Sequence, residues 1–471
     1  MVPADQGGGV MRADLLTDLV DGLDEVFAAV AAVDQALAAG LLRPTPDQTA
    51  GLTVLADAMA GSPLAARVAE AVAKAAAGAA GEEHFVSLAA ARIALFGSVH
   101  DALMARIEQA TGRVRSAEVV PASGGGPVVN LLVAARTWLS DLARAGWRGM
   151  DHDLVSGAGP LISALLPEPG LRRLAALLDG FAAELAASCP GSALARIPLR
   201  RWGDLWSRAM LLTLPGATET ATGTVTGRLL PLGVDLHEHA TAAQVQVHAV
   251  FEPTDGGPSR LVRASVSTAK PDTVIGAGIW QLLRPHMSLL AAVSEGRSME
   301  LTDMPATAEG DLLWLDEHAR MSEPADAFAT ARVALPAAST PPTAPLDRHP
   351  ARIVVPVFLE GYTAEQVGET LTFALAGQRL AVDADRVPAA GPLTPELVAA
   401  SNACVGLLRW DAGSFRVQPL AVETTVRKKT VALHAGAWAG GTVDKAGVKA
   451  EKAASEATAV LRERAGRLLR K

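Results

Sequence analysis

The stretch LRRWGDLWSRAM, from Leu199 to Met210, separates a part of the chain that has helical patterning from a part that has strand patterning. Its apolar residues recur at spacings of three and four, at Trp202, Leu205, Trp206, Ala209 and Met210. This spacing predicts an amphipathic helix with both tryptophans on its buried face. Arg200, Asp204 and Arg208 lie on the opposite face at intervals of four residues, the spacing at which a carboxylate meets a guanidinium group on the neighbouring turn. We expect this face to meet water.

The two tryptophans of this helix allow two interpretations. A buried indole removes about 150–250 Å² of surface from water, so we favour a core helix at the seam between two domains. The alternative is an aromatic and cationic surface that binds a partner protein. Arg200 and Arg201 are the candidate residues for that contact.

The region before this helix predicts an all-helical domain over residues 12–215, after a Gly-rich N-terminus, residues 1–11, that we expect to be disordered. Apolar residues recur between Leu15 and Phe27 at spacings of three and four, and Gly40 ends this first segment. Similar segments follow, separated by Gly or Pro, and their Ala-rich faces allow helices to pack closely. We therefore expect a helical bundle.

After Pro215 the period of the apolar residues changes from that of a helix to that of a strand. Leu230, Leu232, Val234 and Leu236 alternate with other residues, and two similar runs follow. This pattern predicts a β-meander. We expect a helix from about Ile279 to Val293 to cover it, so that residues 216–335 form a domain of a β-meander plus a helix.

The last third of the chain predicts a linker, a small domain and a helix. Residues 336–350 contain five prolines and predict the linker. Residues 351–441 predict a small α+β domain, with a hairpin turn at residues 411–414 and Cys404 on an apolar helix. Residues 442–471 predict a basic C-terminal helix. The expected fold class is therefore α+β, with an N-terminal all-helical bundle, a mostly antiparallel β-containing region and a C-terminal helix.

The composition favours a cytoplasmic protein without a membrane span. Of the 471 residues 49% are hydrophobic, but the longest uncharged apolar runs, such as Leu397 to Leu408, are shorter than the ~18–20 residues of a membrane-spanning helix. The N-terminus has no basic region followed by an apolar segment, so we expect no secretory signal. Cys189 and Cys404 lie in different predicted domains, which argues against disulfides and fits a reducing cytoplasm.

The charge is unevenly distributed along the chain. The formal net charge is −8, yet the segment from Val426 to Lys471 contains eleven Lys and Arg against four Asp and Glu. The candidate partner-binding residues of the predicted C-terminal helix are Lys445, Lys449, Lys452, Arg462, Arg467 and Arg470. The apolar stripe of this helix consists mostly of methyl groups, so burying it would stabilise packing of the helix against the rest of the chain only weakly. Packing on the acidic remainder of the chain and docking onto another protein or a nucleic acid are the alternatives.

One polar cluster has the composition of a metal site. The four candidate ligands are Asp235, His237, His239 and His248. The first three repeat every two residues on a predicted strand and so share one face, and His248 shares a face with Gln244 and Gln246 on the next strand. Such a set suits zinc, nickel or iron. A solvated sheet face has the same pattern, and we expect no bound metal or other cofactor.

No assembled catalytic motif accompanies these features. The sequence contains neither a Gly-x-Ser-x-Gly elbow, nor a His-Glu-x-x-His helix, nor a kinase signature. Gly276 and Gly278 imitate the start of a dinucleotide-binding loop, but Gln281 takes the place of its third small residue. We therefore expect a non-enzymatic adaptor or accessory subunit that acts through protein–protein contacts. The alternatives are a metal-dependent enzyme that uses the histidine face and a nucleic-acid accessory protein that uses the basic helix.

Overall fold

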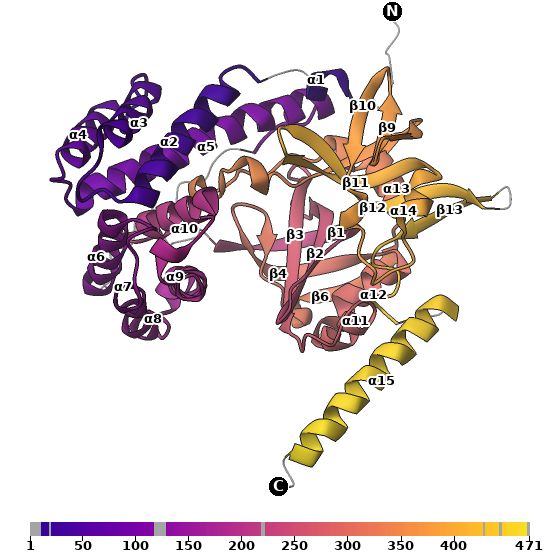
Figure 1. Ribbon diagram of the computed structural model, residues 1–471. Coiled ribbons are helices and arrows are strands. Elements are labelled where there is room, and N and C mark those ends of the chain that lie inside the picture. The colour runs from indigo at the N-terminus through magenta and orange to yellow at the C-terminus, as the bar shows by residue number, and fades with distance from the viewer. Residues whose placement is uncertain are drawn as a thin grey trace, which may run out of the picture.

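The computed structural model describes residues 11–17, 20–116, 129–217, 222–426, 429–441 and 445–468. Helices come first, two β-sheets follow, and the C-terminal helix α15 (Lys445–Leu468) projects from the body (Figure 1). The predicted α+β class and this order of elements are therefore confirmed. Of the N-terminal residues expected to be disordered, residues 1–10 lie outside the described part, and Met11 is buried.

The N-terminal helices pack around one apolar core, except α1, whose Leu16 packs in the core of the second sheet. They are α1 (Asp14–Thr17), α2 (Leu23–Ala39), α3 (Pro46–Ala58), α4 (Ala65–Ala76), α5 (Glu82–Thr111), α6 (Val129–Ala145), α7 (His152–Ser156), α8 (Ala158–Leu165), α9 (Arg172–Ala187) and α10 (Leu199–Leu212). Local sequence sets their ends. The Thr45 hydroxyl caps α3 by accepting a hydrogen bond from the backbone N–H of Gln48, and Gly40 follows the last residue of α2.

Helix α10 buries its apolar face in this core. Trp202 and Trp206 are fully buried, and Nε1 of Trp206 donates a hydrogen bond of 2.9 Å to the carbonyl oxygen of Leu139. The expectation that the opposite face meets only water is wrong for Arg208, whose side chain is 8% exposed. Its ion pair of 2.9 Å with Asp204 one turn earlier is the one that the spacing predicts, and its burial comes from Asp347 of a distant segment, 3.8 Å away.

Helix α5 connects two cores. Its first half packs in the helical core, through Phe85 and Leu88, and its second half packs against the second sheet, through Leu103 and Ile107. Among the described residues it is the one helix long and apolar enough to cross a membrane by length and composition. Most of that stretch is buried inside the protein, as in a core helix of a soluble domain.

The first sheet closes into a small barrel. Its strands are β1 (Thr222–Glu238), β2 (Ala242–Pro253), β3 (Arg260–Ala269), β4 (Arg297–Thr307), β5 (Asp311–Leu312) and β6 (Ala319–Pro324). They pair in the order β1-β2-β3-β5-β4-β6, and β4 also pairs with β1, which closes the ring. The single helix expected over this sheet is divided into α11 (Gly278–Leu282) and α12 (Met287–Glu295), because Pro285 interrupts it.

A β-bulge changes which residues of β1 face the barrel interior. The expected alternation from Leu230 to Leu236 is broken, because the pairing with β2 shifts register between Pro231 and Gly233. Leu232 packs outside the barrel with residues of the second sheet, whereas Val234 packs in the barrel core. The side chain that follows Val234 therefore faces the second sheet.

The second sheet contains β7 (Val355–Glu360), β8 (Thr363–Val367), β9 (Thr370–Leu375), β10 (Gln378–Val382), β11 (Ser401–Asp411), β12 (Ser414–Val426) and β13 (Lys429–His434). The order is β7-β11-β12-β10-β9-β8, with β13 beside β12, and two short helices, α13 (Ala327–Val333) and α14 (Pro395–Ala399), accompany it. The predicted hairpin turn is confirmed, with positive φ at Ala412 and Gly413. Cys404, expected on a helix, lies in β11, because periodicity alone does not distinguish a short buried strand from a helix.

The proline-rich segment, residues 336–350, is held by backbone hydrogen bonds on both sides. The N–H of Leu261 in the barrel donates to the carbonyl oxygen of Ser339 at 2.9 Å, and the N–H of Thr340 donates to that of Val114 after α5 at 2.9 Å. Two 3₁₀ turns, η6 (Pro345–Asp347) and η7 (Pro350–Arg352), then lead into β7. The segment thus joins the helical region to both sheets.

Candidate functional site

The strands that carry the histidines pair as their sequence pattern predicts. β1 and β2 run antiparallel, with Asp235 opposite Gln246 and His237 opposite Gln244. His248 lies further along the same face of β2 and is buried. This face points away from the barrel interior, because the alternate residues of β2 fill the barrel core.

Asp235 is the centre of a buried polar cluster between the two sheets. Its carboxylate forms an ion pair of 2.6 Å with Nη2 of Arg409 and accepts a hydrogen bond of 2.7 Å from Nε2 of Gln418. Nε2 of His237 lies 3.0 Å from the same carboxylate. Burial alone would raise the pKa of Asp235, but the hydrogen bond from His237 and the charge of Arg409 hold that pKa well below its usual value. The cluster therefore connects the barrel to the second sheet.

The candidate metal ligands do not assemble into a metal site. His239 lies after the end of β1 and is exposed, whereas Asp235 is already occupied by Arg409. Within the described part of the chain, no three His, Cys, Asp or Glu side chains are placed to hold a metal ion together. Asp235 instead forms an ion pair with Arg409 and accepts a hydrogen bond from Gln418.

His248 differs from the other candidates because it is buried without a hydrogen bond at one nitrogen. Its Nε2 atom has no partner among the described residues. Burial, followed by the positive charge of Arg263, lowers the pKa of His248 to about 3. The imidazole is therefore neutral at pH 7 and retains one unused hydrogen-bonding position.

A cavity of about 1050 Å³ lies between the helical region, the outer wall of the barrel and the beginning of the second sheet. Its polar lining residues include Gln244, Gln246, His248, Arg263 and Ser265 of the barrel, Arg173 of α9, and Thr343, Asp347 and Arg352 of the segment before β7. Cavities of this size between structural units are common sites for small ligands. It is therefore a candidate ligand site.

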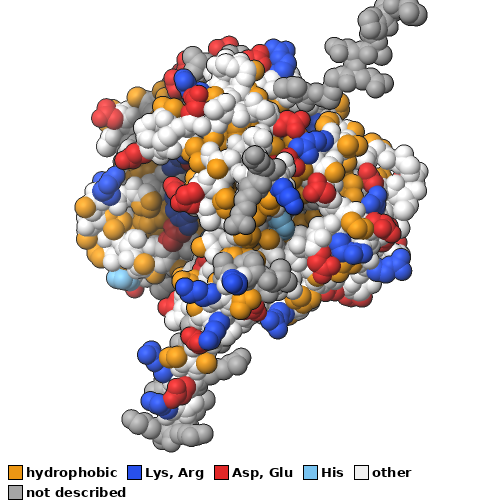
Figure 2. All heavy atoms as spheres, turned by 90° about the vertical axis from the view of Figure 1, so that its right-hand side faces the viewer, with side chains coloured by type: hydrophobic (Ala, Val, Ile, Leu, Met, Phe, Trp, Pro, Cys, Tyr) orange, Lys and Arg blue, Asp and Glu red, His pale blue; other side chains and the backbone are white. Residues whose placement is uncertain are grey.

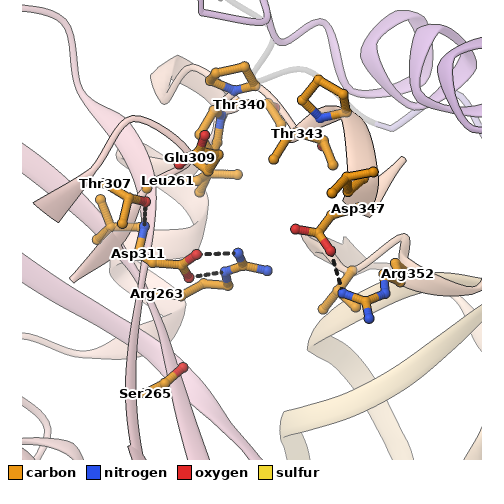
Figure 3. Close-up of a pocket in the computed structure, with 18 of the residues that line it drawn as sticks. Leu261, Arg263, Ser265, Thr307, Glu309, Asp311, Thr340, Thr343, Asp347 and Arg352 are labelled. Carbon is orange, nitrogen blue, oxygen red and sulfur yellow. Dashed lines mark hydrogen bonds and ion pairs between the residues drawn. The ribbon is translucent and has the colours of Figure 1, made fainter. Parts of the chain in front are cut away.

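Two ion pairs face each other across this cavity (Figure 3). On the barrel side, Arg263 donates two hydrogen bonds, of 2.8 and 2.9 Å, to the carboxylate of Asp311. On the other side, Asp347 accepts a hydrogen bond of 2.6 Å from Arg352 and two contacts of 3.1 Å from Arg173. Arginines from three separate parts of the chain therefore line one space.

Further ion pairs connect the cavity wall to the helical core. Arg208 lies 3.8 Å from Asp347 and 2.9 Å from Asp204, and Asp204 lies 3.8 Å from Arg92 of α5. Arg92 in turn forms a fully buried ion pair of 2.7 Å with Asp34 of α2. This chain of contacts links the cavity wall to the helical core.

The partner-binding candidates on α10 already have contacts within the chain. Arg201 forms an ion pair with Glu184 of α9. Arg200 is exposed, and its guanidinium carbon lies 5.1 Å from the centre of the Phe27 ring. Both arginines remain exposed, so their role in binding a partner protein stays a prediction.

The candidates on α15 are exposed where the structure describes them. Lys445, Lys449, Lys452 and Arg467 are exposed, whereas the Arg462 side chain and Arg470 lie outside the described residues. Contacts with the body lie near the start of the helix, where Glu451 is 3.6 Å from Arg284 of the turn after α11. The far end stands away from the body, and Lys and Arg side chains gather along the helix and at its base (Figures 1 and 2).

Sequence reasoning singled out His248, Gln244 and Gln246, which line the cavity, but it missed the arginines of the lining. Arg173, Arg263 and Arg352 lie in three segments far apart in the chain, and none belongs to a motif. The polar face of β2 was the available signal, since Gln244, Gln246 and His248 are polar on a strand that packs inside the protein.

Comparison with known proteins identifies no relative, since no protein-family profile, curated protein or solved structure matches this chain.

Proposed function

We propose that this protein is a non-enzymatic cytoplasmic adaptor or accessory subunit that binds an acidic surface of another protein through α15. The observation that carries the proposal is the position of this helix. It extends from the body with its described cationic side chains exposed (Figures 1 and 2).

The energetics of an isolated helix support a partner for α15. Its 24 residues contact the body mainly near the start, where Gln281 donates hydrogen bonds of 3.3 Å to Glu451 and Ser455 and Ala450 packs against the barrel core. Helices without tertiary packing are marginally stable in water. Val448 and Val460, 51% and 46% exposed, would gain burial in a complex.

The charge of the helix favours an acidic partner surface. Residues 445–468 contain six Lys and Arg against three Glu, whereas the whole chain is acidic. Complementary charge accelerates association and selects the partner. Surface attraction of this kind weakens as salt rises, because the Debye length falls to about 8 Å at 0.15 M ionic strength.

The proposal is tested by isolating complexes from the source cell with three forms of the full chain. In the first variant Lys445, Lys449 and Lys452 are all changed to Glu. In the matched control, three exposed cationic residues of the helical region, Arg43, Arg67 and Lys74, are changed to Glu. The wild type and the control are expected to retain one stoichiometric protein partner that the α15 variant loses, and the retained amount should fall with added salt.

Two outcomes would contradict this function. The first is an identical set of partners for all three forms. The second is a bound fraction that disappears after nuclease treatment, which would make nucleic acid the ligand of the helix. In either case the three lysines of α15 would not form a protein-binding surface.

A further inference from the structure

The cavity between the barrel and the second sheet has more hydrogen-bond donors than its acidic side chains can accept. Arg263 donates hydrogen bonds to Asp311, and both Arg173 and Arg352 donate hydrogen bonds to Asp347. An arginine carries five N–H donors and no acceptor, whereas a carboxylate offers about four acceptor sites. Three guanidinium groups therefore keep donors that these two carboxylates do not satisfy. The excess remains when Glu309 on the same rim is counted as a third carboxylate.

Most of the excess N–H donors lie around Asp347. Nη2 of Arg173 and Nη1 of Arg352 contact the same oxygen, Oδ1, at 3.1 and 2.6 Å, and Nη1 of Arg208 lies 3.8 Å from it. Burial, followed by the positive charge of Arg208, lowers the pKa of Arg352 from its usual value, as expected where cations are crowded. Paired guanidinium groups bind phosphate oxygens with good geometry.

The opposite wall offers uncharged polar groups. Gln244, Gln246 and Ser265 point from the barrel into the cavity, and none of their side chains forms a hydrogen bond to another described residue. His248 is buried beside them with Nε2 unpartnered. Buried polar atoms without partners are rare in folded proteins and call for a ligand or water. Amides, a hydroxyl and a neutral imidazole together suit the hydroxyl groups or ring nitrogens of a small molecule.

We propose that this cavity binds a small phosphorylated metabolite, with the phosphate group held by Arg173 and Arg352 and the polar body against Gln244, Gln246 and Ser265. A phosphate is favoured over a single carboxylate because it offers three acceptor oxygens to the two guanidinium groups. The site is independent of the protein contact proposed for α15, since the two lie on different parts of the molecule.

The experiment measures the melting temperature of the full chain with a panel of sugar phosphates and nucleoside mono- and diphosphates, each beside its unphosphorylated parent and inorganic phosphate. At least one phosphorylated compound is expected to raise the melting temperature, because a ligand that binds only the folded state stabilises it by mass action. Its parent and phosphate alone should raise the melting temperature less. Calorimetric titration then gives the dissociation constant.

Two variants and a control locate the site. The double change Arg173→Gln and Arg352→Gln should raise the dissociation constant by on the order of tenfold or more, since it removes charged hydrogen bonds. Arg196→Gln, at an exposed arginine away from the cavity, should leave it unchanged. Ser265→Phe should weaken binding by blocking the part of the cavity beside the barrel wall, and it gives a second measurement if the arginine variant does not fold.

Three results would overturn the proposal. They are a panel in which no compound raises the melting temperature, a parent compound that binds as tightly as its phosphate, and arginine and Ser265 variants that bind like the Arg196→Gln control.

Discussion

Replacing Gly203 with Ala is expected to destabilise the protein, although it should favour the helix. Gly203 lies in α10 beside the buried pair of Asp34 and Arg92. A Cβ atom there would lie 3.0 Å from Cγ of Asp34 and 3.1 Å from Nη2 of Arg92, and closer still to Oδ1 of Asp34. The carboxylate must therefore move away from the guanidinium group to which it is bound at 2.7 Å.

The magnitude follows from two opposing effects. Moving Asp34 weakens two charge-assisted hydrogen bonds from Arg92, of 2.7 and 3.2 Å, and each such bond contributes about 1.5–3 kcal/mol. Gly to Ala in a helix interior contributes about 1 kcal/mol in the other direction. The net expectation is a loss of about 2–5 kcal/mol in the free energy of unfolding.

The assay is urea unfolding followed by tryptophan fluorescence, with Gly180→Ala as the matched control. Gly180 is exposed in α9, and no atom lies within 4 Å of the Cβ it would acquire, so that variant should gain up to about 1 kcal/mol. A Gly203→Ala protein as stable as the control would refute the close approach of α10 to the Asp34–Arg92 pair.

Three further changes test other parts of the structure. His248 has a pKa of about 3 when folded and about 6.5 when unfolded, so its stabilising effect is complete above pH 6.5 and is lost as pH falls toward 3. His248→Gln should therefore flatten the dependence of the melting temperature on pH in this range, whereas His239→Gln, at an exposed site, should not. Trp206→Ala should cost about 3–5 kcal/mol in urea unfolding by opening a cavity in the helical core, and an unchanged midpoint would place the indole on the surface. Arg409→Met should cost about 3–5 kcal/mol by leaving Asp235 buried without its partner, and adding Asp235→Leu should restore part of the loss; no recovery would argue against their ion pair.

Periodicity predicted the order of elements and the pairing of the histidine strands because both depend on local patterns. The spacing of Trp202 and Trp206 placed α10 correctly, and the two-residue repeat placed Asp235 and His237 on one face. Local patterns did not predict the β-bulge before Val234, because the extra residue is detectable only through its pairing partner.

Local sequence patterns do not predict the cavity that forms the candidate site. The cavity requires α9, β3 and the segment before β7 to meet, and no periodicity carries that information. The burial of Arg208 has the same cause, since its neighbour Asp347 lies 3.8 Å away in space but in a distant segment of the chain. Proline content indicated a linker at residues 336–350, whereas their hydrogen bonds to the helical region and to the barrel come from tertiary structure.

Hydrogen exchange of the backbone amides is the most direct test of the claim that α15 is available to a partner. In the purified chain the amides of residues 445–468 should exchange far faster than those of α5, because most of α15 stands away from the body (Figure 1). They should become protected once the partner protein is bound. Protection of α15 equal to that of α5 in the protein alone would show that the helix is held by its own chain, and would contradict the proposed function.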